Sequence, residues 1–292
     1  MSVAALRAPS GLTLLKLGRV SNLPTVWTNV IAGAILANAA APVADVVIAG
    51  LAMTAFYVGG MYLNDFFDRE IDARERPGRP IHAGAISAGA VSTIGFALLA
   101  IGVMLLAPFG LVTVIWGLAL AAAIVLYDAW HKGNFFAPVI MGLCRALVYL
   151  ATGSAIGGNT SQTLIIGAVV LMAHVVGLTY AAKQENLNEV GRLWPLAILA
   201  VPLLLALAHL AAGWPVIVFA LLLCAADVFA VRLLAKRATP VAVPRAVSVL
   251  IAAICLVDAL AVVLFDGSLV LASICAVGYL LTRLFQAVIP GT

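Results

Sequence analysis

Residues 64–72 read Asn64-Asp65-Phe66-Phe67-Asp68-Arg69-Glu70-Ile71-Asp72 and follow a long apolar run, in a chain where only 10% of residues are charged. On a helix, Asn64 or Asp65, Asp68 and Asp72 recur every three to four residues and share one face. Three carboxylates on one face repel each other unless a cation lies between them. A few carboxylates together with substrate phosphates are the usual ligands of protein-bound Mg²⁺. The stretch therefore predicts a Mg²⁺–diphosphate site at a membrane surface. The alternative is a solvated helix end, salt-bridged to Arg69, Arg74, Arg76 and Arg79.

The composition places the chain in a membrane. Hydrophobic residues make up 64% of its 292 residues, and the mean hydropathy is +1.16, whereas soluble domains are roughly 45–50% apolar. A soluble protein of this length could not bury so much apolar surface, so lipid must be the solvent. Residues 1–19 lack the pattern of a cleaved signal peptide. The four cysteines lie in apolar runs without CxxC spacing, which indicates core residues and not ligands.

Ten apolar segments approach the roughly 20 residues that a membrane span requires. They cover residues 20–39, 44–63, 88–107, 109–127, 135–153, 163–182, 194–211, 214–235, 245–265 and, shorter and weaker, 268–287. Abundant Gly, Ala and Ser inside them allow close helix packing in lipid. The sequence thus predicts an all-α, polytopic transmembrane bundle with nine core spans and a tenth C-terminal span. Residues 1–292 form a single domain.

The distribution of basic residues predicts the orientation. Lys and Arg occur before the first span and in the loops after the second, fourth, sixth and eighth spans, while the intervening loops contain neither. This alternation satisfies the positive-inside rule at every loop and supports the span count. The N-terminus and the loops that carry the acidic motif are therefore expected on the cytoplasmic side of the cell (inner) membrane.

A second polar cluster leaves the sixth span on the same side. It reads Lys183-Gln184-Glu185-Asn186-Leu187-Asn188-Glu189, and Glu185 and Glu189 share a helix face. Two acidic helix ends on one membrane face are suited to hold two Mg²⁺ ions between them. An ordinary polar helix end is the alternative for this cluster.

Four cations are predicted to neutralise diphosphate oxygens: Arg79, Lys132, Arg145 and Lys183. Arg145 is the most informative, because an arginine inside an apolar span normally faces a polar cavity or a partner. For Arg79 and Lys132, the topology of basic loops alone is the alternative explanation.

Polar residues inside other spans are weaker candidates. Asn22 and Asn29, two turns apart in the first span, are expected to line the same cavity, and Asn22 is a predicted substrate contact. Asp227 and Asp258 are carboxylates within spans that we leave outside the predicted site.

These motifs resemble those of the UbiA superfamily of intramembrane prenyltransferases. Residues Asn64 to Asp72 match its NDxxDxxxD motif, residues 79–84 match its following arginine–proline segment, and Tyr127 with Lys132 resemble its basic loop. The resemblance extends over residues 16–265. It implies nine helices around a cavity open to lipid, and Mg²⁺-dependent transfer of an isoprenoid from a prenyl diphosphate to a lipophilic, commonly aromatic acceptor. Membrane lipid is an expected partner and nucleic acid is not.

The resemblance also implies roles for individual residues. Asn64 and the catalytic residues Asp65, Asp68 and Asp72 would hold the diphosphate through Mg²⁺, while Arg79 and Lys132 would contact its oxygens. The second motif departs from the family's DxxxD pattern, since it has no aspartate, and leaves Glu185 and Glu189 as the candidate ligands.

The residues around Gly18–Gly33 and Gly142–Gly153 are similar to a branch that includes EboC-like proteins. CDP-alcohol phosphotransferases also use spaced aspartates, but their pattern has a DG dipeptide where this chain has Asp68-Arg69, and their GxxxDxxxD segment does not occur in this chain. A non-catalytic lipid-handling or transport protein on the same fold is the alternative function.

Overall fold

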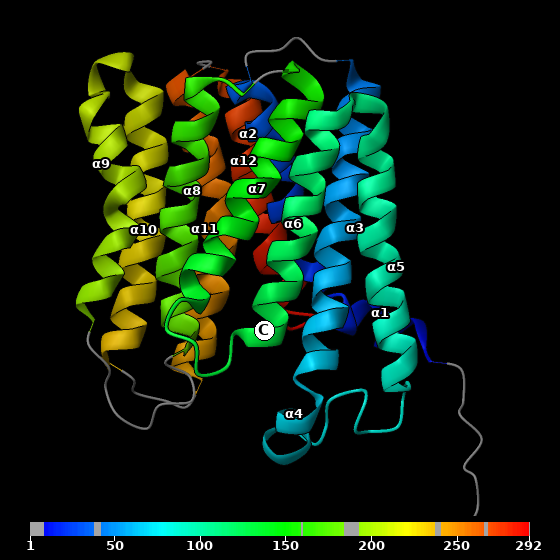
Figure 1. Cartoon of the computed structure of the whole chain (residues 1–292). Helices are drawn as coiled ribbons and strands as arrows, with labels where there is room; N and C mark the ends of the chain where they lie inside the picture. The colour runs from blue at the N-terminus through cyan, green and yellow to red at the C-terminus, as the bar shows by residue number, and fades with distance from the viewer. Residues whose placement is uncertain are drawn as a thin grey trace, which may run out of the picture.

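Long antiparallel helices run through the whole of the described chain (Figure 1). The structure is a computed structural model that describes residues 9–37, 42–158, 160–183, 193–236, 241–265 and 268–291. Every regular element in these ranges is an α-helix or a short 3₁₀-helix. The prediction of an all-α bundle is therefore confirmed.

Eight of the helices are long and apolar enough to cross a membrane. They are α3 (Val43–Phe67), α5 (Ala88–Leu106), α6 (Leu111–Trp130), α7 (Ala137–Gly157), α8 (Gln162–Lys183), α10 (Trp214–Lys236), α11 (Ala242–Phe265) and α12 (Leu269–Gln286). Leu, Val, Ile and Phe side chains lie exposed along α5, α6, α10 and α12, where water would make them unfavourable. The chain is a multi-pass membrane protein.

The first and seventh predicted spans are shorter and begin as 3₁₀-helices. The first consists of η1 (Val20–Asn22) and α2 (Leu23–Leu36), and the seventh of η4 (Trp194–Ala200), α9 (Val201–Ala208) and η5 (Leu210–Ala212). Prolines stand in the first turns of η4 and α9, where a missing N–H is tolerated. A 3₁₀-helix rises about 2.0 Å per residue and an α-helix about 1.5 Å, so residues 194–208 extend roughly 26 Å and nearly cross the bilayer core.

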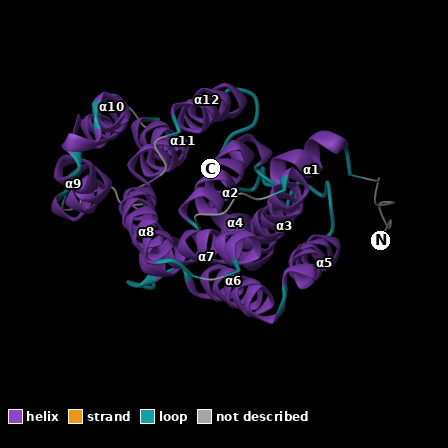
Figure 2. Cartoon of the chain, turned by 90° about the horizontal axis from the view of Figure 1, so that it is seen from above, coloured by secondary structure: helices purple, strands orange, loops and turns teal. Residues whose placement is uncertain are grey.

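The centre of the bundle is formed by α2, α7 and α11, with the other helices around them (Figure 2). Most residues of α11 are buried, and it packs against α2, α8, α10 and α12. The tenth predicted span is confirmed as α12, which covers the side of the bundle between α2 and α11.

One end of the bundle carries the short helices α1 (Gly11–Leu17) and α4 (Arg69–Glu75), and the C-terminus lies near them (Figure 1). The connections at this end contain Lys and Arg, while those at the opposite end contain none. The helix α3 extends four residues beyond the span predicted to end at 63, so Asn64 and Asp65 belong to it. The acidic motif is thereby held at the basic end of the bundle.

Candidate active site

The acidic motif forms a continuous helical turn across the junction of α3 and α4. The Asp68 N–H donates to the Asn64 carbonyl and the Asp72 N–H donates to the Asp68 carbonyl, both at 2.9 Å. This i to i+4 bonding keeps the helical repeat through Asp68, which is the C-cap of α3 and the N-cap of α4. Four side chains of the motif, those of Asn64, Asp65, Asp68 and Asp72, are buried, with 4–9% of their surface exposed. Buried carboxylates require partners, and the surrounding helices supply them.

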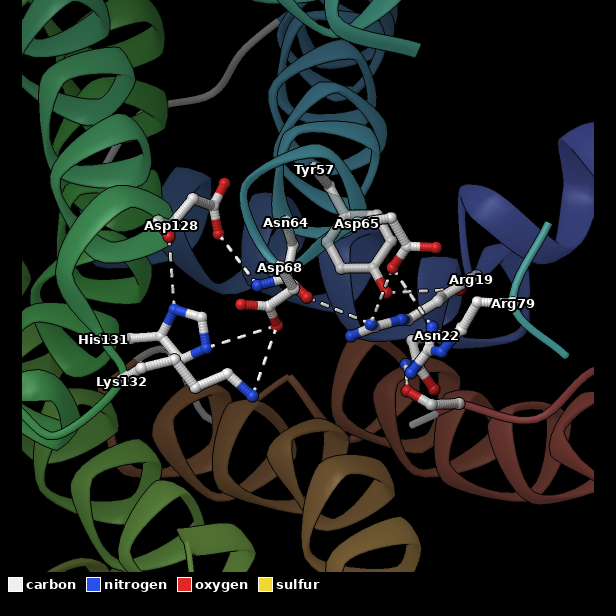
Figure 3. A network of polar contacts seen from close by, with 11 residues as sticks. Arg19, Asn22, Tyr57, Asn64, Asp65, Asp68, Arg79, Asp128, His131 and Lys132 are labelled. Atoms are coloured by element: carbon white, nitrogen blue, oxygen red, sulfur yellow. Dashed lines mark hydrogen bonds and ion pairs between the residues drawn. The ribbon is translucent and has the colours of Figure 1, made fainter. Parts of the chain in front are cut away.

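Two arginines from different segments converge on Asp65 (Figure 3). The Arg79 guanidinium lies 3.1 Å and that of Arg19 lies 3.3 Å from Asp65 Oδ1, and Arg19 also donates to Asn64 Oδ1 at 3.1 Å. Arg79 therefore pairs with the motif itself, as the alternative of a salt-bridged helix end also expects. Its contact with diphosphate oxygens stays a prediction. Of the arginines in the alternative reading, Arg69 instead pairs with Glu70, at 3.6 Å.

Two basic side chains that directly follow α6 lie beside Asp68. His131 Nε2 and Lys132 Nζ are each 3.5 Å from Asp68 Oδ2, and the Tyr127 ring stacks on His131 with centroids 5.0 Å apart. Burial by itself raises the pKa of Asp68, but the hydrogen bond and charge of His131, together with Lys132, outweigh it and leave this pKa below its usual value. The structure thus favours the ionised form of Asp68.

The electrostatic balance differs at the far end of the motif. Burial raises the pKa of Asp72, with Arg79 opposing the shift and Asp68 and Asp65 adding to it. Burial, together with the neighbouring Arg19, lowers the pKa of Arg79, against the opposing effect of Asp65. The motif is therefore a crowded set of acids and bases in which each cation offsets like-charge repulsion among the carboxylates.

A fourth carboxyl group, Asp128 of α6, lies directly behind the motif. The Asn64 amide donates to Asp128 Oδ1 at 3.2 Å, and only 5% of Asp128 is exposed. We did not predict Arg19, Asp128 or His131 as site residues. Arg19 and His131 counted only as basic loop residues, and Asp128 lies one residue beyond the predicted fourth span. The sequence did contain one indication of Asp128, which is a carboxylate between Tyr127 and Lys132 at the end of an apolar span.

A cavity of about 240 Å³ adjoins the motif. Its polar end includes Arg19, Asn64, Asp68, Arg79, His131 and Lys132. Its remaining wall is largely apolar and comes from α8 and α11, through Val175, Leu178, Val247, Ile251 and Ile254. The cavity therefore combines a charged head region with an apolar interior, which matches the two chemical halves of an amphiphilic substrate.

Asn22 and Arg145 line this cavity, and their contact with the substrate stays a prediction. The Asn22 amide donates to the Gly291 carbonyl at 2.9 Å and accepts from Gln286 at 3.0 Å, so the C-terminal segment also holds it. Arg145 donates to Asn29 Oδ1 at 2.8 Å and to Thr25 at 3.1 Å. Its guanidinium lies 5.7 Å from the centre of the Tyr57 ring.

Behind Arg145, Asp258 accepts hydrogen bonds from Asn29 and from the Tyr149 hydroxyl, the latter at 2.6 Å. This network satisfies a carboxylate deep in the bundle. Lys183 instead donates to the Asn134 carbonyl and does not line the cavity. Glu185 and Glu189 lie outside the described residues.

The oxygens of Asn64, Asp65 and Asp68 are the ligand type that Mg²⁺ prefers. No three acidic, imidazole or thiol groups of the described residues converge on one point, and Asp65 and Asp68 instead contact the cations named above. A Mg²⁺ site of one or two carboxylates completed by substrate phosphates does not need three such groups. The residues present therefore fit a metal that binds together with a diphosphate.

The chain is similar to proteins of one family. Its sequence matches the model of the UbiA prenyltransferase family over residues 25–242. No curated protein matches it significantly in sequence. Solved structures with the same architecture include the apo form of a UbiA homologue from Aeropyrum pernix K1, with a TM-score of 0.68 and 17% identity over 84% of this chain and 97% of that chain.

Two further structures are similar in fold. A UbiA homologue from Archaeoglobus fulgidus bound to DMAPP and Mg²⁺ gives a TM-score of 0.59 and 17% identity, covering 84% of this chain and 99% of that chain. A digeranylgeranylglyceryl phosphate synthase gives a TM-score of 0.61 and 20% identity, covering 87% of this chain and 98% of that chain. Identities this low establish the shared fold alone. The family match runs from α2 to the start of α11 and includes the entire acidic motif, and on this evidence the chain belongs to the UbiA prenyltransferase family.

Proposed function

We propose that this protein transfers an isoprenoid from a prenyl diphosphate to a lipophilic acceptor within the membrane, in a Mg²⁺-dependent reaction. The observation that carries the proposal is the cavity at the motif, which is lined both by basic side chains, among them Arg19, Arg79 and Lys132, and by apolar side chains of α8 and α11. A prenyl diphosphate has the matching form, with a trianionic head and a hydrocarbon tail. Family membership supports the same activity.

The proposed ligands of Mg²⁺ are the oxygens of Asn64, Asp65, Asp68 and Asp72, and Glu185 and Glu189 remain predicted ligands outside the described residues. When bound there, Mg²⁺ supplies positive charge that stabilises the diphosphate as a leaving group. Asp65 pairs with Arg19 and Arg79, and Asp68 pairs with Lys132. These ion pairs offset the repulsion among several buried acids.

The cations of the chain stabilise the departing diphosphate. Arg19, Arg79 and Lys132 line the cavity and carry spare N–H groups beyond those that contact the motif carboxylates. Hydrogen bonds from these groups to phosphate oxygens strengthen as negative charge develops during cleavage of the carbon–oxygen bond. The electron pair of that bond leaves with the diphosphate, and an allylic cation develops at the isoprenoid carbon.

The apolar walls protect that cation from water. Side chains of α8 and α11, together with Met61 and Met141, border the same cavity, and exclusion of water prevents hydrolysis of a reactive carbocation. The acceptor then attacks the carbon to form the new bond, and the proton that it loses passes to the released diphosphate. In this proposal the protein lies in the cell membrane with the basic end of the bundle on the cytoplasmic side. The water-soluble diphosphate head reaches the motif from that side.

The decisive experiment uses the protein in lipid nanodiscs with radiolabelled prenyl diphosphates of several lengths. Diphosphate release and transfer of label to a new lipid are measured with and without Mg²⁺ and a membrane-lipid extract as acceptor. We expect Mg²⁺-dependent transfer, which Asp65→Asn and Asp68→Asn lower by on the order of 100-fold or more.

Asp227→Asn is the matched control, because Asp227 is another buried carboxyl group of the bundle and does not line the cavity. This variant should retain the wild-type rate. Full activity in Asp65→Asn and Asp68→Asn would refute the metal assignment. Folded wild-type protein that transfers no isoprenoid from any donor to the extract would favour a lipid-handling or transport role instead.

A further inference from the structure

Asp128 lies behind the motif and not in the cavity that we assign to the diphosphate. It is not among the residues that line that cavity, but it does line a smaller one of about 80 Å³ deeper in the bundle. Figure 3 shows Asp128 on the core side of Asn64, on the side away from Arg79. Within the described part of the chain, the only hydrogen bond to the Asp128 side chain comes from the Asn64 amide to Oδ1, and Oδ2 is buried without a partner. The Asp128 backbone carbonyl lies 3.3 Å from His131 Nδ1.

This arrangement is unfavourable for stability. A buried carboxyl oxygen without a donor loses the hydrogen bonds that it had in water. An apolar residue at position 128 would avoid that loss. Val, Met, Phe, Leu and Ile side chains make up most of the lining of the smaller cavity, together with Tyr57, Tyr127 and Arg145. The Asp128 carboxyl group is therefore explained by its other oxygen, Oδ1, which accepts the Asn64 amide hydrogen.

The contact fixes which way the Asn64 amide points. An asparagine side chain ends in an oxygen that accepts and a nitrogen that donates, and rotation by 180° exchanges them. Asn64 Nδ2 donates to Asp128 at 3.2 Å, and Asn64 Oδ1 accepts from Arg19 at 3.1 Å. Rotation would bring the amide NH₂ against the Arg19 donor and the amide oxygen against the Asp128 acceptor, so both contacts would be lost.

We propose that Asp128 is a positioning residue: by holding Asn64 Nδ2 on the core side, it keeps Asn64 Oδ1 facing the cavity, ready to ligate the metal of the Mg²⁺–diphosphate complex. The inference rests on the proposed function. Arg19 holds the same orientation only while it contacts Asn64. Once its guanidinium turns to the diphosphate, Asp128 is the contact that remains. Residues that orient metal ligands in this way commonly contribute about 10- to 100-fold to metal affinity.

The test measures binding and not turnover. Radiolabelled geranyl S-thiolodiphosphate, in which a carbon–sulfur bond replaces the reactive carbon–oxygen bond, is bound to protein in nanodiscs at increasing Mg²⁺ concentration. In Asp128→Asn the residue keeps its size but presents both a donor and an acceptor, so it no longer selects one amide orientation. We expect the Mg²⁺ concentration for half-maximal binding to rise roughly tenfold or more. Asp227→Asn is the control for loss of a buried carboxyl group and should match the wild type.

Two combined variants separate positioning from other roles. In Asn64→Ala there is no amide to orient, so adding Asp128→Asn should change the Mg²⁺ requirement less than about twofold. The exchange of both residues, Asn64→Asp with Asp128→Asn, restores a donor behind an oxygen ligand, and it should recover most of the wild-type Mg²⁺ affinity. The exchanged pair retains its hydrogen bond and so keeps the test valid if the single Asp128 variant folds poorly.

Three results would overturn the inference: an unchanged Mg²⁺ requirement in Asp128→Asn, a full additional loss on top of Asn64→Ala, or no recovery in the exchanged pair. A wild-type protein that binds the analogue without any need for Mg²⁺ would instead refute the proposed function. The wild-type measurement alone therefore distinguishes failure of the proposed function from failure of the role of Asp128.

Discussion

At the scale of single residues, Arg19 combines a functional side chain with an unusual backbone. Its φ of 42° and ψ of 46° lie in the left-handed region, and it is the one non-glycine residue of the described chain with positive φ. This conformation is unfavourable for any residue with a Cβ. The turn aims the guanidinium at Asn64 and Asp65, and the Tyr57 hydroxyl donates to the Arg19 carbonyl at 3.2 Å. Strain of this kind is found where a functional group must be positioned.

Two substitutions of Arg19 separate backbone from side chain. Arg19→Ala and Arg19→Gly both remove the guanidinium, so both should weaken binding of a prenyl diphosphate to a similar extent. Glycine adopts the left-handed conformation without strain, so Arg19→Gly should be more stable than Arg19→Ala by about 0.5–1 kcal/mol. Thermal unfolding in detergent, with analogue binding measured in parallel, tests both statements. Equal stability of the two variants would contradict the strain at this turn.

The pKa of Asp68 predicts a dependence of stability on pH in the Mg²⁺-free protein. His131 and Lys132 outweigh the effect of burial and hold this pKa below the usual 3.8. The unfolded state therefore binds a proton more readily than the folded state, and the stabilisation is complete above the unfolded pKa and lost as pH falls through the folded pKa. The stability difference between wild type and Asp68→Asn should shrink below about pH 4. Unfolding temperatures measured from about pH 6 to pH 3 test this, and a constant difference would argue against ion pairing of Asp68.

The site residues that the sequence predicted are those whose local pattern carries the signal. The repeat of Asn64, Asp65, Asp68 and Asp72 follows from helical periodicity, and the family resemblance marked Arg79 and Lys132. Arg19 and Asp128 contact motif residues that are 46 and 64 positions away in the sequence. A single sequence does not show which distant residues come together in the fold. The left-handed backbone at Arg19 could not be predicted either, because this conformation is usually marked by a glycine and position 19 is an arginine.

At the scale of elements, close contact between α3 and α5 holds the helix that carries the motif. Gly59 of α3 and Gly95 of α5 face each other, and a Cβ at Gly59 would lie 2.9 Å from the Gly95 carbonyl oxygen and 3.1 Å from the Leu98 side chain. Backbone cannot move aside as a flexible side chain can. In lipid, such small-residue contacts are a main source of helix association.

We therefore expect Gly59→Ala to destabilise the protein by about 1–3 kcal/mol, because α5 must shift away from α3. The matched control is Gly89→Ala in the first turn of α5, where an added Cβ has no neighbour within 4 Å, and its stability should be unchanged or slightly raised. Thermal unfolding in the same detergent compares the two variants. Equal unfolding temperatures would show that the α3–α5 contact is looser than described.

The elements also show where sequence reasoning was incomplete. Length and hydropathy located all ten helical segments, including α12, but they did not predict that the seventh is built from a 3₁₀-helix followed by an α-helix. The prolines that start both parts are visible in the sequence. Which hydrogen-bonding pattern follows each of them depends on packing against α8, and that is a tertiary property.

At the scale of the whole molecule, five separate segments meet at one end of the bundle to form the site: the turn at Arg19, the end of α3, α4, the loop that contains Arg79 and the end of α6. Each is adjacent to a basic connection. The bias of charge from which we predict the orientation in the membrane therefore also supplies the cations of the proposed site. In this proposal, the same residues determine orientation and substrate binding.

This coupling predicts which face of the membrane exposes each end. Glu75, at the end of α4, and Ala211, in η5, are exposed at opposite ends of the bundle. In a background with the four native cysteines replaced by alanine, Glu75→Cys should react with a membrane-impermeant maleimide only from the cytoplasmic side, and Ala211→Cys only from the other side. Intact cells expose the outer face of the membrane, and inverted vesicles expose the cytoplasmic face. Geranyl S-thiolodiphosphate should also bind to inverted vesicles without permeabilisation. Labelling of both positions from one face would mean that the number of helices between them is wrong, whereas an exchange of the two faces would place the site outside the cytoplasm.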